Sequence, residues 1–323
     1  MSEPTSIRIG TRASLLARTQ TGWVAERLGS LGHAVSIETI STSGDERGDV
    51  PVPGIGGDGV FVRELEAALL AGRIDAAVHS LKDLPTAETS GLTLACVPVR
   101  ALPFDVFVSN RSPTLEALSP GAIVGTSSIR RALLLKSLRP DLEVRGIRGN
   151  VDSRLRKLDA DDYDGLILAG AGLERLGLQD RITEVLRPPA FWPAVAQGAL
   201  VVQTRTDDAP TRAAIAPLDD PQTHAAVVAE RSFLAALAGG CLAPIGAWAR
   251  SSTDGALTLG GCVLEAKAGS VQRIVAEAVA RPDETPEMLG LTVAGQLRAA
   301  GADAMLAASR AAHREIPGQA DRR

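Results

Sequence analysis

The chain has 323 residues, of which 45% are hydrophobic, 22% charged and only 3% aromatic. This composition predicts a globular protein of two or three domains with an aliphatic core. The N-terminus lacks a basic start followed by an apolar stretch, and no run of about 18 apolar residues occurs. Three scattered cysteines argue against a disulfide framework. We therefore expect a cytoplasmic protein without a membrane partner.

Charge is unevenly distributed, although the net charge is only -4. Residues 130–156 carry eight basic side chains against three acidic ones, a local excess of 8 - 3 = +5. The basic ones are Arg130, Arg131, Lys136, Arg139, Arg145, Arg148, Arg154 and Arg156, and the acidic ones are Asp141, Glu143 and Asp152. This stretch predicts a field that attracts anions. The scarcity of aromatic side chains and the negative total charge argue against nucleic acid.

The first hundred residues alternate between strand-like and helical patterns. Strand-like runs occur at 6–12, 34–41, 74–80 and 92–99, and helical patterns at 15–28 and 60–72. Such alternation predicts a mostly parallel sheet with helices on both faces. Cys96 lies in one strand-like run and Cys262 in a later one, so we expect both in the core.

A second cycle of strands and helices begins near Phe104. The run at 199–205 reads as a strand that returns to the first sheet, so the chain would cross twice between two hinged lobes. Later runs predict a small antiparallel sheet with helices. We expect domain 1 at 1–98 and 199–216, domain 2 at 99–198, domain 3 at 217–312 and a flexible tail at 313–323. The fold class is therefore α/β with an α+β C-terminal domain.

The segment "GIGGDG" at 54–59 matches a dinucleotide-binding fingerprint. That fingerprint needs a strand before its first glycine, and Pro51 and Pro53 exclude a central strand there. We interpret residues 43–59 as a loop.

Hydroxyl and basic side chains gather where predicted strands end. In "GTSSIRR", Thr126 and Ser128 precede a helix whose first turn carries Arg130 and Arg131. Cations oppose the helix dipole at this end, which indicates a bound anion. Similar positions are occupied by Arg12, Ser14, Arg148, Arg154 and Arg175. Because strand ends share one crevice in α/β sheets, we expect these guanidinium groups to converge on carboxylates or phosphates.

The segment "AAVHSLKDLP" at 76–85 places Ser80, Lys82 and Asp83 at the end of another strand. An aspartate there is either a turn former or an ionised group that acts on a cation or a proton. In "LAGGCLAPIG", Cys241 follows two glycines that we expect to end the preceding helix. This cysteine either fills an apolar gap or accepts a bulky group beside the glycines.

Eight segments in order, over about residues 7–308, are similar to the porphobilinogen deaminase (hydroxymethylbilane synthase) family. They are "TRAS", "FVRELEAALL", "AAVHSLKDLP", "GTSSIRR", "RGNVDSRLRKLD", "AGLERLGL", "PAVAQGA" and "GGCLAPIG". The resemblance implies two lobes like those of type II periplasmic binding proteins. It also implies a transferase that condenses four porphobilinogen molecules on a dipyrromethane cofactor, with loss of ammonia, and releases hydroxymethylbilane by hydrolysis.

The same resemblance implies roles for individual residues. Cys241 would carry the cofactor through a thioether, and Asp83 would be catalytic. Contacts to the cofactor would come from Ser80, Lys82, Asp83, Thr126, Ser128, Arg130, Arg131 and Arg148, and contacts to the substrate from Arg12, Ser14, Arg148, Arg154, Arg175 and Gln197. No metal is implied, and we expect a monomer. The chain departs from the family pattern at Asp58, Phe104 and Ala196, where we expect lysine, arginine and glycine.

Three other functions compete with this interpretation. A non-enzymatic anion-binding protein with two hinged lobes would explain the arginines and serines, but not Asp83 or Cys241. A nucleic-acid binder would use the basic stretch without aromatic side chains for stacking. A cysteine-dependent hydrolase would need a histidine beside Cys241, and the sequence has none there.

Overall fold

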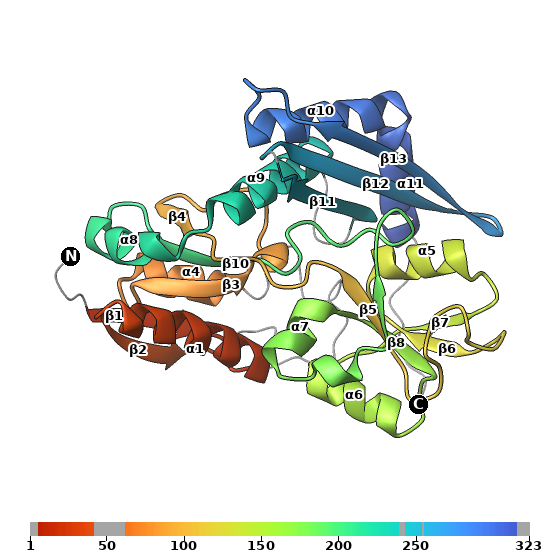
Figure 1. Ribbon diagram of the computed structural model, residues 1–323, viewed down its shortest axis with the longest axis horizontal. Coiled ribbons are helices and arrows are strands. Elements are labelled where there is room, and N and C mark those ends of the chain that lie inside the picture. The colour runs from red at the N-terminus through yellow and green to blue at the C-terminus, as the bar shows by residue number, and fades with distance from the viewer. Residues whose placement is uncertain (1–5, 42–61, 239–242, 254, 315–323) are drawn as a thin grey trace.

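The computed structural model describes residues 6–41, 62–238, 243–253 and 255–314 (Figure 1). The predicted loop at 43–59 with Asp58, and Cys241 with its two glycines, lie outside the described residues. Within the described residues, no helix is long and apolar enough to cross a membrane.

Lobe 1 is a five-stranded sheet with helices. The strand order is β2 (Ala34–Thr39), β1 (Ser6–Thr11), β3 (Ala76–Ser80), β10 (Leu200–Arg205) and β4 (Leu92–Cys96). Its described helices include α1 (Leu15–Ser30), α4 (Arg63–Leu70) and α8 (Ala209–Ile215). β1 is parallel to β2 and β3, whereas β10 is antiparallel to β3 and β4. The predicted return of residues 199–205 to the first sheet is thus confirmed.

Lobe 2 repeats this arrangement. Its strand order is β7 (Glu143–Arg145), β6 (Ile123–Gly125), β8 (Gly165–Ala169), β5 (Asp105–Val108) and β9 (Glu184–Leu186). Its helices include α5 (Ile129–Leu138), α6 (Val151–Asp159) and α7 (Gly170–Arg175). β5 is antiparallel to both of its neighbours. In each lobe, the antiparallel strand is therefore the one that directly follows a crossing of the chain.

Domain 3 covers one side of both lobes and appears in teal to blue in Figure 1. Strands β11 (Ile245–Ser251), β12 (Leu257–Lys267) and β13 (Ser270–Val279) form an antiparallel sheet. Helices α9 (Pro221–Ala236), α10 (Pro286–Ala299) and α11 (Ala302–Arg314) accompany it. The predicted fold class is confirmed, while the domain boundaries stay a prediction.

Two local expectations need correction. Helix α9 ends at Ala236, and Ala238 takes the left-handed conformation with φ of 48°, so the chain turns before the glycine pair predicted to cap it. Helix α11 continues to Arg314, so residues 313 and 314 of the predicted tail are helical, while the flexibility of the tail stays a prediction. The core prediction for Cys96 and Cys262 is confirmed, since both are fully buried. Burial raises the pKa of each thiol to about 12.

The two crossings touch each other between the lobes. The Ala101 amide donates to the Gly198 carbonyl at 3.2 Å. Gly198 has φ of 89°, and a Cβ there would lie 2.6 Å from the Ala101 carbonyl oxygen, so only glycine fits. This contact fixes the place where the lobes meet.

Candidate active site

Two adjoining cavities lie where the lobes and domain 3 meet. The first, of about 260 Å³, is bounded by α1 and the end of β3 in lobe 1 and by α6 and α7 in lobe 2. The second, of about 330 Å³, extends from the start of α5 to Leu234, Ala243 and Ile245 of domain 3. Lys82, Arg131 and Arg154 line both. The cavities therefore form one continuous site.

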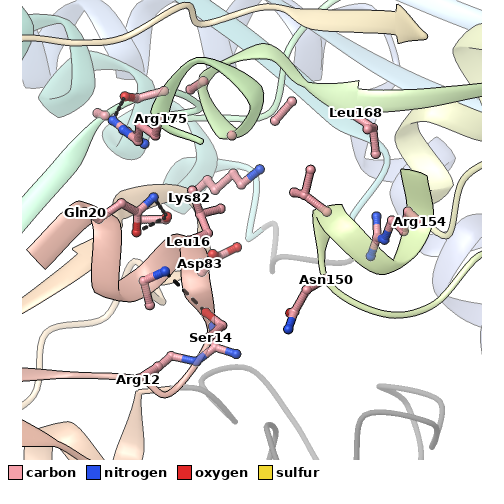
Figure 2. A pocket seen from close by; sticks show the side chains of 18 of the residues that line it. Arg12, Ser14, Leu16, Gln20, Lys82, Asp83, Asn150, Arg154, Leu168 and Arg175 are labelled. Atoms are coloured by element: carbon pink, nitrogen blue, oxygen red, sulfur yellow. Dashed lines mark hydrogen bonds between the residues drawn. The ribbon is translucent and has the colours of Figure 1, made fainter. Parts of the chain in front are cut away.

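Most of the predicted site residues line these cavities. The first is lined by Arg12, Ser14, Ser80, Lys82, Asp83, Arg131, Arg154 and Arg175, and the second adds Ser128, Arg130 and Arg148. Figure 2 shows Arg12, Ser14, Lys82 and Asp83 on one side of the first cavity and Arg154 on the other. Thr126 and Gln197 are buried beneath the site and do not line it. Cys241 lies outside the described residues.

Helix starts explain how the side chains reach the site. Ser14 caps α1 by accepting from the Ala17 amide at 3.3 Å. Ser128 caps α5 in the same way, accepting from the Arg131 amide at 3.5 Å. Each serine follows a strand of its sheet. The basic residues beside it, such as Arg12 and Arg130, therefore lie at the ends of these strands.

Arg130 and Arg131 have an internal partner that the sequence reasoning missed. The fully buried Asp105 carboxylate lies 2.7 Å from Arg130 Nη1 and 2.7 Å from Arg131 Nη2. Arg131 Nε also donates to it at 2.9 Å. The two guanidinium groups hold the pKa of Asp105 well below its usual range, despite its burial. These arginines are therefore partly neutralised before any ligand binds.

Gln197 joins this ion cluster to lobe 1. Its Nε2 donates to Asp105 at 3.0 Å and to the Pro103 carbonyl at 2.9 Å. Its Oε1 accepts from Lys82 Nζ at 3.5 Å and from Arg131 Nη2 at 3.4 Å. The buried amide thus orients the cations that line the cavities.

The local excess of +5 at 130–156 separates into two groups. The three acidic residues form ion pairs that are at least partly exposed, namely Arg139 with Asp141, Arg145 with Glu143 and Arg156 with Asp152. The five remaining cations are Arg130, Arg131, Lys136, Arg148 and Arg154, and all but Lys136 line the second cavity. Among the described residues, no acidic side chain pairs with Arg148 or Arg154.

Burial and mutual repulsion lower the pKa of several cations. The pKa of Lys82 falls to about 8 because of burial, with Asp83 acting in the opposite direction. Burial, reinforced by Arg131 and Arg148, lowers the pKa of Arg154 to about 10, and burial lowers that of Arg175 to about 10. A bound anion would stabilise the charged forms of these side chains, which burial and mutual repulsion disfavour. The site is therefore suited to carboxylate or phosphate groups.

Asp83 lies in the 3-10 turn η1 (Leu81–Asp83), directly after β3. Its side chain is exposed at the first cavity (Figure 2). No hydrogen bond or ion pair reaches its carboxylate from the described part of the chain. It is the one carboxylate among seven cations that line the two cavities, counting described residues only.

Other lining residues went unnoticed in the sequence. Gln20 Nε2 donates to Ser80 Oγ at 3.0 Å. Gln20 stands one helical turn after Leu16, which also lines the cavity, so helical spacing could have revealed it. Asp105 could also have been noticed in the sequence, because it is a charged residue at the start of the otherwise apolar strand "DVFV". No cluster of three or more potential metal ligands occurs in the described ranges.

Comparisons with known proteins decide the family. A family model described as "Porphobilinogen deaminase, dipyromethane cofactor binding domain" matches residues 7–213, and "Porphobilinogen deaminase, C-terminal domain" matches 224–299. The chain belongs to the porphobilinogen deaminase family. Porphobilinogen deaminase of Roseiflexus castenholzii is 46% identical over 94% of this chain and 99% of its own. That of Syntrophobacter fumaroxidans is 48% identical over 80% of this chain and 84% of its own.

Solved structures with a similar course of the chain include a periplasmic substrate-binding protein of an ABC transporter from Coxiella burnetii. It is 19% identical, covers 70% of this chain and 96% of its own, and has a TM-score of 0.42. The methionine-binding protein MetQ covers 66% of this chain and 89% of its own, at 16% identity and a TM-score of 0.43.

The structure shows the surroundings of two residues that depart from the porphobilinogen deaminase pattern. Ala196, where we expected glycine, has φ of 57°, a conformation that costs alanine about 1–2 kcal/mol. Phe104, where we expected arginine, packs edge-on against Trp248 of domain 3 with ring centroids 4.9 Å apart. Phe104 thus joins lobe 2 to domain 3.

Proposed function

We propose that the two cavities bind a dipyrromethane cofactor and porphobilinogen, and that Asp83 acts on the substrate there. The observation that carries this assignment is that, among the described residues, Asp83 is the single carboxylate beside seven cations at one site. The reaction condenses four porphobilinogen molecules with loss of ammonia and then releases hydroxymethylbilane by hydrolysis. In the family, the cofactor supplies the covalent primer on which the product grows.

The side chains that line the two cavities fit such a cofactor. Dipyrromethane and porphobilinogen carry carboxylates on apolar rings, and the cavities combine cations with apolar side chains. Leu16, Val151 and Leu168 line the first cavity, and Val195 and Leu234 line the second. Arg130, Arg131 and Arg148 would hold the cofactor in the second cavity, close to Ala243. Cys241, the proposed attachment residue, precedes Ala243 by two positions in the sequence.

The first cavity contains four of the groups proposed to bind substrate, namely Arg12, Ser14, Arg154 and Arg175. Guanidinium groups suit the two substrate carboxylates because they donate in parallel pairs. When ammonia leaves, the remaining pyrrole carries positive charge. The Asp83 carboxylate, exposed at the same cavity, would stabilise that charge and accept a pyrrole proton.

We further propose a monomer in the cytoplasm with neither nucleic acid nor membrane as a partner. The two described cysteines, Cys96 and Cys262, are free thiols, which suits a reducing compartment. Light scattering of the purified protein would measure its oligomeric state.

The intact mass of the purified chain tests the proposed function. We expect native protein to exceed the sequence mass by one dipyrromethane, and we expect Cys241→Ser to lack this increment. Cys96→Ser is the matched control, because its thiol is buried in lobe 1 and should leave the increment unchanged. A native mass equal to that of the bare chain would contradict the proposal and favour a non-enzymatic anion-binding protein.

A further inference from the structure

The turn that carries Lys82 and Asp83 is held from both sides by apolar side chains. Leu81 is 1% exposed and Leu84 is 6% exposed, and both belong to an apolar cluster shared with Val227 and Phe233 of helix α9. The Leu81 amide donates to the Ala199 carbonyl at 3.0 Å, and the Leu84 amide donates back to Leu81 at 3.2 Å. The turn thus follows β3 of lobe 1 but belongs to an apolar cluster that extends into domain 3.

Arg231 of α9 completes this attachment. Its Nη2 donates to the Pro85 carbonyl at 2.8 Å, and its Nη1 donates to the Leu84 carbonyl at 3.3 Å. These are the first two carbonyls after Asp83. A guanidinium that bridges consecutive carbonyls restricts the backbone of the turn, because its donors form a rigid fork.

The neighbouring residue on α9, Glu230, fixes the helix itself. Its fully buried carboxylate accepts from Arg100 at 2.6 Å, from the Ala196 amide at 2.6 Å and from the Ala249 amide at 2.8 Å. Arg100 and Ala196 belong to the two crossings, and Ala249 belongs to β11. Helix α9 is therefore a rigid support to which Arg231 can fasten the turn.

We propose that Arg231 is a positioning residue that holds the Asp83 carboxylate in place by fastening the turn to helix α9. The inference rests on the proposed function, because the position of Asp83 matters only where Asp83 acts on substrate. Arg231 does not line either cavity and so acts through the turn. A displacement of about 1 Å at a reacting group can lower turnover by up to about a hundred-fold.

Three variants test this role. Arg231→Met keeps an apolar stem but removes the donors, and Arg231→Lys keeps the charge and a donor. Arg273→Met is the matched control, because Arg273 also donates to two consecutive carbonyls, those of Pro189 and Ala190, away from the cavities. We expect Arg231→Met to lower kcat about ten-fold or more while KM and the dipyrromethane mass increment stay unchanged. Arg231→Lys should recover part of kcat, and Arg273→Met should retain it.

Hydrogen exchange measures how firmly the turn is held, without relying on activity. In Arg231→Met, the Leu84 amide should exchange faster, while the Leu237 amide at the end of α9 should exchange as in the wild type. Unchanged kcat, or unchanged exchange at Leu84, would overturn the inference. Equal losses in Arg231→Met, Arg231→Lys and Arg273→Met would also overturn it, since they would indicate general destabilisation. A wild type that releases no ammonia would instead refute the proposed function and, with it, this inference.

Discussion

Two aspartates near the site, Asp83 and Asp105, have opposite environments. Asp105 is fully buried and contacts Arg130, Arg131 and Gln197, whereas Asp83 is exposed and forms no hydrogen bond or ion pair with the described residues. A paired, buried carboxylate orders the groups around it, but its oxygens are occupied. An exposed carboxylate beside a cavity can meet a substrate. The same functional group thus serves structure in one place and is available for chemistry in the other.

The comparison predicts that Asp105 determines stability. In the cofactor-free Cys241→Ser background, Asp105→Asn should lower the free energy of unfolding by about 3–5 kcal/mol, because two buried guanidinium groups lose their counter-charge. Urea denaturation measures this change. Asp141→Asn is the control, since its pair with Arg139 is partly exposed and should contribute no more than about 1 kcal/mol. Equal losses in the two variants would contradict the assignment of Asp105.

Arg131 and Arg148 should differ in the same way as the two aspartates, since Arg131 is paired inside the protein and Arg148 is available to a ligand. Arg148 has no acidic partner in the described ranges, so Arg148→Met should keep its stability and lose about ten- to a hundred-fold in kcat/KM, equivalent to roughly 1.5–3 kcal/mol. Arg131→Met should also lose stability, because Asp105 loses one of its two cations. Urea denaturation and steady-state kinetics separate these outcomes. An Arg131→Met protein as stable as Arg148→Met would show that the pairing with Asp105 contributes little.

The pKa of Lys82 depends on both carboxylates. Burial lowers this pKa to about 8, and Asp83 and, less strongly, Asp105 oppose that decrease. In the cofactor-free protein, Asp83→Asn should lower this pKa further, and more than Asp219→Asn does, because Asp219 pairs with His224. An NMR titration of the Lys82 amine measures it. Since the folded-state pKa lies below the ordinary value of 10.5, the folded protein binds fewer protons between the two values, and stability should rise with pH there. If Asp83→Asn left the pKa of Lys82 unchanged, the Asp83 carboxylate would lie too far from Lys82 to act on a substrate in the same cavity.

Much of the fold could be predicted from the sequence because its signals are local. The start of helix α5 after Ser128 could be predicted, because serine is a preferred residue at the position that caps a helix. The arginines follow strands, so their convergence could also be anticipated. The end of α9 was misplaced, because Ala238 takes a conformation that the adjacent glycines favour more.

The environment of Asp105 could not be read from its neighbours in sequence. Arg130 and Arg131 are 25 and 26 positions away, and Gln197 is 92 positions away. Their contact depends on the antiparallel insertion of β5 beside β8, which follows from a crossing of the chain. The basic side chains in the first turn of α5 indicated a bound anion, and the structure shows that one carboxylate they contact is the protein's own Asp105.

The most direct test of the account is ammonia release by Asp83→Asn, measured together with its urea denaturation. Asparagine keeps the shape and turn-forming ability of Asp83 but removes its charge. We expect wild-type stability and a loss of at least about a hundred-fold in porphobilinogen-dependent ammonia release, at about 1.4 kcal/mol per ten-fold. Asp83→Glu should retain part of the activity. Wild-type ammonia release from a stable Asp83→Asn protein would contradict the account and make Asp83 a turn residue.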